Sequence, residues 1–510
     1  MLVQAAFHSL RSYRREKILE SIKLFFTKRT TVIAMIATIV SGLAVHFYKF
    51  TNDLPTWDSM YLIDAPIRGT SNFGRWFSGI SANLLSSEYS VPWVIGLVSL
   101  VLLALTVALL TDLFEIHQTF YILLTAVLLV TFPSVTATFA YMEWADAYFL
   151  SFFFSILAVY LCIKRKRTYL LPALLISLSM GIYQVYFSTA IICFLLYLFK
   201  RHILDNERLM TQKWIVLSFG INLLLGVVLY FVINKLNLAY WGIDLSEYQG
   251  VDSVGLLSLD GYMQAFVKTI DSFGSFFMGK SELTLYLVLN AAFLLLFAIL
   301  LLLVFVIAGM RKFASLLVFF VASLVVSHVY YFASSGVLYH TVMIVNIYFV
   351  FFLAILILMN VKMSKFLINA NVIVLLLLAF YHFVNANVAY TQMQMSYEKS
   401  YFTATEIMTK ADSINDGSIR DIVIAGGVKS PKDSIEALPK ITGASSDLFL
   451  KKEPHYLKFF QYYLNRPYEP VDEKKRARIL ESREFKKMDV YPNGEYAKVI
   501  DDTIVVKLSK

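Results

Sequence analysis

The chain has 510 residues, of which 58% are hydrophobic and only 16% carry charge, and its formal net charge is +9. A soluble domain is usually about 45–50% apolar and about 25% charged, whereas here long apolar runs fill the region from residue 31 to residue 386. These runs exclude a soluble enzyme, a disordered chain and a disulfide-stapled secreted module. They predict a polytopic α-helical membrane protein.

Apolar runs that could cross a membrane follow one another through most of the chain. A transmembrane helix needs about 20 apolar residues. Single spans are expected near residues 31–49, 93–111, 119–134, 147–163, 213–233, 283–309, 313–332, 337–360 and 367–386. Segment 168–199 is too long for one ordinary helix and has basic clusters at both ends, so it predicts a tight hairpin with its tip at Tyr183-Gln184-Val185-Tyr186. The total is about eleven transmembrane helices.

The basic residues lie in short clusters between the apolar runs, which is a topology signal and not a sign of nucleic-acid binding. They predict an N-terminus inside the cell and, after eleven crossings, a C-terminus outside. The predicted organisation is a basic amphipathic interfacial segment (1–30), a transmembrane domain (31–386) with outer loops (50–92, 134–146 and 234–282), and a small extracytoplasmic α/β domain (387–510). Strand-like runs at 421–425 and 503–508 support the last of these.

The first outer loop carries three carboxylates, Asp53, Asp58 and Asp64, just after the first span and at the depth of a lipid headgroup. Arg68 and Arg75 follow. Apolar residues then recur at helical spacing from residue 73 to residue 84, which predicts an amphipathic helix in the outer interface. Because arginine pairs with phosphate and a carboxylate can take a proton from a hydroxyl, the pattern favours a site for a phospholipid-like substrate. An ordinary solvated loop is the alternative.

Further polar residues are predicted on the same side of the membrane. Glu143 and Asp146 lie at the start of the fourth span, where Asp146 is also interpretable as a helix N-cap. Tyr183 and Gln184 lie at the hairpin tip, where turn chemistry alone would explain them. His340 belongs to a cluster of histidines and tyrosines, and its plain alternative is a hydrogen-bonded interface residue. Their convergence predicts a polar site on the outer face.

No motif for a nucleotide, a metal or a redox centre is present in the sequence. There is no P-loop, no dinucleotide-binding glycine fingerprint and no HExxH. Cys162 and Cys193 lie in apolar runs and are interpreted as small hydrophobic residues. No cofactor and no metal are therefore predicted, and whether a divalent ion assists stays open.

Several short motifs, in this order, resemble the GtrII-type glucosyltransferases, which are bacterial membrane enzymes that decorate surface polysaccharides. The motifs are Trp57-Asp58, Gly74-Arg75-Trp76, Phe132-Pro133-Ser134, Asp146-Ala147-Tyr148-Phe149, Gly181-Ile182-Tyr183-Gln184, and a tail with Val490-Tyr491-Pro492-Asn493-Gly494 and Ile504-Val505-Val506-Lys507-Leu508. This family is similar to the broader GT-C glycosyltransferases, which use a polyprenyl-phosphate sugar as donor and an acidic residue of the first outer loop as general base. The resemblance implies an enzyme of the bacterial cytoplasmic membrane with its active site outside.

The resemblance also implies roles for individual residues. Asp58 would be the general base, with Asp53 and Asp64 as rivals because the chain lacks the adjacent Asp-Asp pair of many GT-C loops. Arg75 would bind the donor phosphate. The other substrate-binding candidates are Arg68, Glu143, Asp146, Tyr183, Gln184, His340 and Lys507. A sugar, with glucose expected, would pass with inversion to a cell-surface polysaccharide, and separate proteins would make the donor and flip it across.

Two other functions stay open from the sequence. A flippase or transporter of lipid-linked sugar or polysaccharide would use the same membrane frame, but it should show a polar path across the bilayer, and few charges lie in the middle of the spans. A surface receptor or assembly scaffold would act through residues 387–510 and leave the carboxylates of 50–92 dispensable. The polar clusters on the outer side favour the enzyme.

Overall fold

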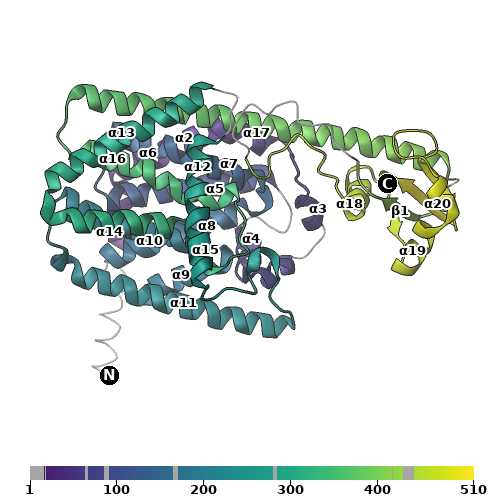
Figure 1. The fold of residues 1–510 in the computed structure, drawn as a ribbon, viewed down its shortest axis with the longest axis horizontal. Coiled ribbons are helices and arrows are strands. Elements are labelled where there is room, and N and C mark those ends of the chain that lie inside the picture. The colour runs from purple at the N-terminus through teal and green to yellow at the C-terminus, as the bar shows by residue number, and fades with distance from the viewer. Residues whose placement is uncertain are drawn as a thin grey trace.

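The computed structural model consists of a large helical bundle and a small α/β unit, joined by one very long helix (Figure 1). It describes residues 17, 19–63, 67–85, 91–164, 170–279, 284–415, 417–428 and 441–509. The long helix is α17 (Lys365–Ser413), whose first half lies along the bundle and whose second half packs on the α/β unit. The predicted span 367–386 is therefore only the first part of a 49-residue helix.

Eight helices in the described part of the chain are long and apolar enough to cross a membrane. They are Arg29–Thr51 (α2), Pro92–Leu113 (α5), Met142–Lys164 (α8), Tyr186–Leu204 (α10 with η2), Leu209–Trp241 (η3 with α11), Leu285–Ala308 (within α13, Thr284–Ala308), Thr341–Asn360 (η5 with α16) and α17. This supports a membrane protein with at least eight spans. The count of eleven and the predicted sidedness stay predictions.

The other apolar helices are bent or short. Helices α6 (Thr119–Thr131) and α7 (Pro133–Ala140) meet at an angle of 43° at Phe132, which is the geometry of either a broken span or a re-entrant loop. The bend follows from Pro133, which lacks the N–H that a continuous helix would need. Helices α9 (Leu170–Ile182) and α14 (Met310–Ser327) are shorter, and α9 and α10 are separated at Tyr183, where the hairpin tip is predicted.

The loops that are predicted to lie outside contain short helices. The first loop holds α3 (Ser59–Leu62), η1 (Ile67–Phe73) and α4 (Ser78–Leu85). The single amphipathic helix predicted for 73–84 is wrong, because Gly74 adopts a left-handed backbone (φ 71°) that ends η1 before α4 begins. The later loops hold η4 (Tyr248–Gly250), α12 (Leu259–Met278) and α15 (Val329–Ala333).

The C-terminal part folds around a four-stranded mixed sheet with the order β2-β1-β4-β3. Strand β1 (Asp421–Ala425) is parallel to β2 (Glu469–Pro470) and to β4 (Thr503–Lys507), and β3 (Ala497–Ile500) forms an antiparallel hairpin with β4. Helices α18 (Glu453–Tyr463), α19 (Glu473–Glu481) and α20 (Arg483–Lys487) accompany the sheet. Met60 of α3 is only 1% exposed and packs into the apolar core formed by this sheet, α18 and the end of α17. The C-terminal part is therefore anchored directly on the first outer loop.

Candidate active site

Asp58 lies where the chain turns from an extended segment into α3, at the N-cap position of that helix. Its side chain is half-buried. Burial raises the pKa of the Asp58 carboxyl to about 6, and the nearby positive charge of Arg75 opposes that rise. A carboxyl with this pKa is mostly ionised at neutral pH yet basic enough to take a proton.

The loop that carries Arg75 is clamped onto the turn between α9 and α10. The backbone N–H of Phe77 donates to the carbonyl of Gly181 at 2.7 Å, and Nε2 of Gln184 donates to the carbonyl of Phe73 at 2.8 Å. A Cβ on Gly74 would lie 2.6 Å from the hydroxyl oxygen of Tyr230, so only glycine fits this position without rearrangement. Two segments more than a hundred residues apart thus fix where Arg75 sits.

The Arg75 guanidinium is held by two stacked tyrosine rings. Its Nη1 donates to the Tyr148 hydroxyl at 3.1 Å, and its Cζ lies 4.6 Å from the centroid of the Tyr183 ring. The two rings are nearly parallel, with centroids 4.6 Å apart. Nε of Arg75 is buried and has no hydrogen-bond partner among the described residues, and no carboxylate in that part of the chain lies within 4 Å of the guanidinium. A buried cation with an unused donor is suited to bind an anion.

A second carboxylate, Glu143, lies beside Asp58. The hydroxyl of Ser59, the residue after Asp58, donates to Oε1 of Glu143 at 3.3 Å. Lys49, near the end of α2, is buried, donates to the carbonyl of Leu54 at 2.6 Å and interacts electrostatically with Glu143. Glu143 in α8 therefore connects the first span to the helix that follows Asp58.

Asp146 is fully buried inside α8, and its Oδ1 accepts a hydrogen bond from the Ala147 backbone N–H at 2.7 Å. The interpretation of Asp146 as an N-cap is wrong, because α8 begins four residues earlier, at Met142. His340 lies directly before η5 (Thr341–Ile347), with its ring centroid 5.5 Å from that of Tyr141 and its Nδ1 accepting from the Val342 N–H at 3.2 Å. Burial lowers the pKa of His340 to about 4, and the positive charge of Arg75 adds to this effect. The imidazole is therefore neutral at physiological pH.

The remaining candidates are placed differently. Asp53 is exposed, and its Oδ2 accepts a hydrogen bond from the Tyr463 hydroxyl of α18 at 2.9 Å, so it contributes to the contact with the C-terminal part. Lys507 lies in the C-terminal sheet, where its ammonium donates to the carbonyls of Phe485 at 3.1 Å and Met488 at 2.9 Å. Asp64 falls outside the described residues, and only the backbone of Arg68 is described.

Tyrosines that the sequence motifs do not single out surround these groups. Tyr148 binds Arg75, Tyr230 accepts from Gln184 at 3.1 Å, and Tyr141 lies near both Asp58 and Glu143. Tyr141 and Tyr148 are seven residues apart at the start of an apolar span, which is two helical turns and thus one face. That spacing was the available signal, but tyrosines are so common at membrane interfaces that it had little weight.

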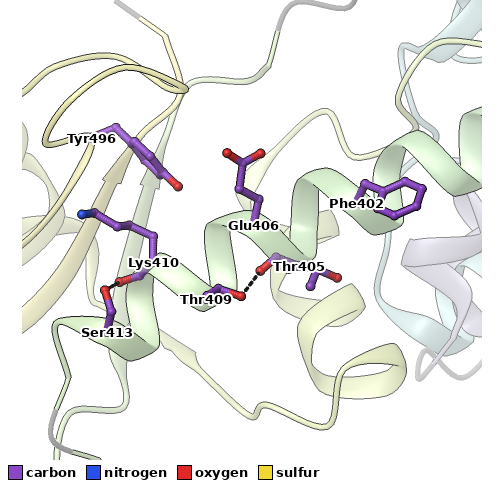
Figure 2. Close-up of a pocket in the computed structure, with 7 residues that line it drawn as sticks. All are labelled: Phe402, Thr405, Glu406, Thr409, Lys410, Ser413 and Tyr496. Atoms are coloured by element: carbon purple, nitrogen blue, oxygen red, sulfur yellow. Dashed lines mark hydrogen bonds between the residues drawn. The ribbon is translucent and has the colours of Figure 1, made fainter.

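An open groove lies elsewhere, between the second half of α17 and the C-terminal sheet (Figure 2). It has a volume of about 540 Å³ and is lined by Phe402, Thr405, Glu406, Thr409, Lys410, Ser413 and Tyr496. None of the candidate site residues lines it. Within the described ranges no group of three or more His, Cys, Asp or Glu side chains is placed to hold a metal ion.

The amino-acid sequence was also compared with known proteins. Curated proteins and solved structures each give no match. The sequence profile described as glucosyl transferase GtrII matches residues 47–358, which is more than half of the chain and includes Asp58, Arg75 and Glu143. The match ends before the C-terminal part, so the resemblance of the tail stays a prediction. The chain therefore belongs to the GtrII glucosyltransferase family, whose members are membrane glycosyltransferases.

Proposed function

We propose that the protein transfers glucose from a polyprenyl-phosphate donor to a cell-surface polysaccharide, at the outer face of the bacterial cytoplasmic membrane. Asp58 is the general base, and Arg75 binds the phosphate of the donor. The observation that carries the proposal is the pairing of a half-buried carboxyl, with its pKa raised to about 6, and a buried guanidinium with an unused donor. The positive charge of Arg75 lowers the pKa of Asp58, so the two groups interact electrostatically.

The reaction is a single displacement. An acceptor hydroxyl oxygen attacks the anomeric carbon of the donor sugar while the bond from that carbon to the phosphate oxygen breaks. The hydroxyl proton passes to the Asp58 carboxylate, and the bonding electrons leave with polyprenyl phosphate, whose negative charge Arg75 stabilises. Attack from the face opposite the leaving group inverts the anomeric centre.

The membrane setting supports a lipid-linked donor. An isoprenoid chain can reach Arg75 only from the bilayer, and Arg75 lies in a loop directly between apolar helices. The phosphate would meet a cation that Tyr148 and Tyr183 already orient, so little conformational entropy is lost on binding. A separate synthase and flippase would supply the donor.

The test uses purified protein in detergent with polyprenyl-phosphate glucose and cell-surface polysaccharide. Asp58→Asn removes the base and keeps the size of the side chain, so we expect the transfer rate to fall by at least about a hundredfold. Asp53→Asn is the matched control, because Asp53 lies in the same loop but contacts α18, and it should keep most of the activity. Full activity in Asp58→Asn would remove Asp58 from the mechanism.

Transfer and flipping assays on the wild-type protein distinguish a glycosyltransferase from a transporter. If the protein binds the donor and moves it across liposome membranes but transfers no sugar to any polysaccharide, then it is a flippase of lipid-linked sugar and not a glycosyltransferase. Transfer in detergent, where no bilayer separates two compartments, would exclude transport as the primary activity.

A further inference from the structure

We propose that residues 441–444 of the C-terminal part complete the active site, because they hold Tyr141 in the position from which its hydroxyl binds the acceptor sugar. This rests on the proposed function and names the side from which the acceptor enters. Tyr141 is then a substrate-binding residue, and Thr442 and Gly443 are positioning residues.

Segment 441–444 inserts into the transmembrane bundle next to the site. Thr442 and Thr341 are joined by three hydrogen bonds: the Thr341 N–H donates to the Thr442 hydroxyl at 3.0 Å, the Thr442 N–H donates to the Thr341 hydroxyl at 3.1 Å, and the two hydroxyls are 2.9 Å apart. Ile441 and Ala444 are 4% and 9% exposed and belong to the apolar core of the bundle. Thr341 directly follows His340, so the segment is fastened at the edge of the site.

Gly443 brings the backbone of this segment against the Tyr141 ring. Its φ is +92°, and an added Cβ would lie 2.7 Å from Cε2 of Tyr141 and 3.1 Å from Cβ of Ala140. The imidazole of His340 also packs on the Tyr141 ring. With the backbone of Gly443 and the His340 imidazole packed on it, the ring has little freedom to move, and only a residue without a side chain allows this approach.

The Tyr141 hydroxyl is available to a ligand. Burial raises the pKa of Tyr141, and the neighbouring carboxylates Asp58 and Glu143 raise it further. The phenol therefore stays protonated and can donate a hydrogen bond. No hydrogen bond from this hydroxyl occurs in the described part of the chain. A sugar hydroxyl that approaches Asp58 would therefore meet a free donor within the same site.

The C-terminal part contacts the residues around Asp58 at a second place. Besides the contact of residues 441–444 with Tyr141, it holds α3 through the buried Met60 and through the edge-on contact of Tyr61 with His455, whose ring centroids are 4.8 Å apart. It therefore flanks Asp58 at two places. A lipid-linked donor would reach Arg75 from the bilayer, and we assign the water-soluble acceptor to the place where the C-terminal part contacts Tyr141 and α3.

The test compares Gly443→Ala with Gly417→Ala in the full-length protein. Gly417 has nearly the same backbone angle (φ +93°), but an added Cβ would meet no atom within 4 Å, so it controls for backbone strain. We expect Gly443→Ala to raise the KM for the polysaccharide at least about fivefold and to leave the Kd for polyprenyl-phosphate glucose within about twofold. Gly417→Ala should match the wild type in both.

Two further variants keep the inference testable if Gly443→Ala fails to fold. Tyr141→Phe keeps the ring and removes the hydroxyl, and Thr442→Val removes the side-chain hydrogen bonds to Thr341. Each should raise the acceptor KM about two- to tenfold with donor binding unchanged. An unchanged acceptor KM in both, or an equal loss of donor binding, would overturn the inference and leave the proposed function intact. A wild type that transfers no glucose would instead overturn the proposed function, and this inference with it.

Discussion

Glucose transfer should fall steeply below pH 6, because Asp58 must be ionised to accept a proton. Burial raises its pKa from the usual value of an aspartate to about 6, with Arg75 opposing the rise. At pH 7 about nine in ten Asp58 side chains are then ionised, and at pH 5 about one in ten, so the rate at saturating substrate should drop about tenfold between these values. His340 does not complicate this range, since its pKa is lowered to about 4.

The measurement is the initial rate of transfer in detergent between about pH 4.5 and pH 8, with each sample returned to pH 7 to confirm that the enzyme survived. A midpoint near 4, as for an exposed aspartate, or a rate that does not change with pH, would refute the argument that a partly desolvated Asp58 is the base.

Removing the charge of Arg75 should also change the pKa of Asp58. Because Arg75 lowers the pKa of Asp58, Arg75→Gln should move the midpoint of the residual activity above 6. Arg75→Lys loses the same guanidinium contacts but keeps the positive charge, so its midpoint should stay closer to that of the wild type. Equal midpoints in the two variants would contradict the electrostatic coupling of Asp58 and Arg75.

Three further predictions concern packing and hydrogen bonds around Arg75 and in the C-terminal sheet. Gly181→Ala should lower the free energy of unfolding by about 1–3 kcal/mol and reduce transfer, because its Cβ would lie 2.6 Å from the indole of Trp76, the residue that follows Arg75. An added Cβ on Gly220 meets no atom within 4 Å, so Gly220→Ala should change neither the thermal unfolding nor the transfer rate. Tyr148→Phe removes a charge-assisted hydrogen bond to Arg75 and should lower kcat/KM for the donor about 10- to 100-fold, and an unchanged value would exclude that bond from donor binding. Lys507→Met removes the hydrogen bonds from the ammonium to the carbonyls of Phe485 and Met488 and should destabilise the C-terminal sheet by about 1–3 kcal/mol. This should appear as faster proteolysis of the C-terminal part, while donor binding stays as in the wild type.

Several features follow from the sequence alone because they depend on local patterns. Apolar runs of about 20 residues are enough to predict membrane helices, and Pro133 marks a break because a proline cannot continue the hydrogen bonding of a helix. The separation of α9 and α10 at Tyr183 follows from the length of the apolar segment and the basic clusters at its ends. The sequence also indicates the loop after the first span as the place of a polar site, since its carboxylates and arginines follow directly after that span, and this stays a prediction.

The choice among the candidate site residues depends on contacts between distant parts of the chain. Asp53 and Asp58 look alike in sequence, yet Asp53 binds a tyrosine 410 residues away, whereas Asp58 lies partly buried near Arg75. Arg75 is oriented by Tyr148, 73 residues away, and the Thr341–Thr442 contact spans 101 residues. Hydropathy and helical spacing report only on neighbours along the chain. Burial, pKa and hydrogen bonding depend on which side chains the packed helices bring together, so the tertiary structure alone decides them.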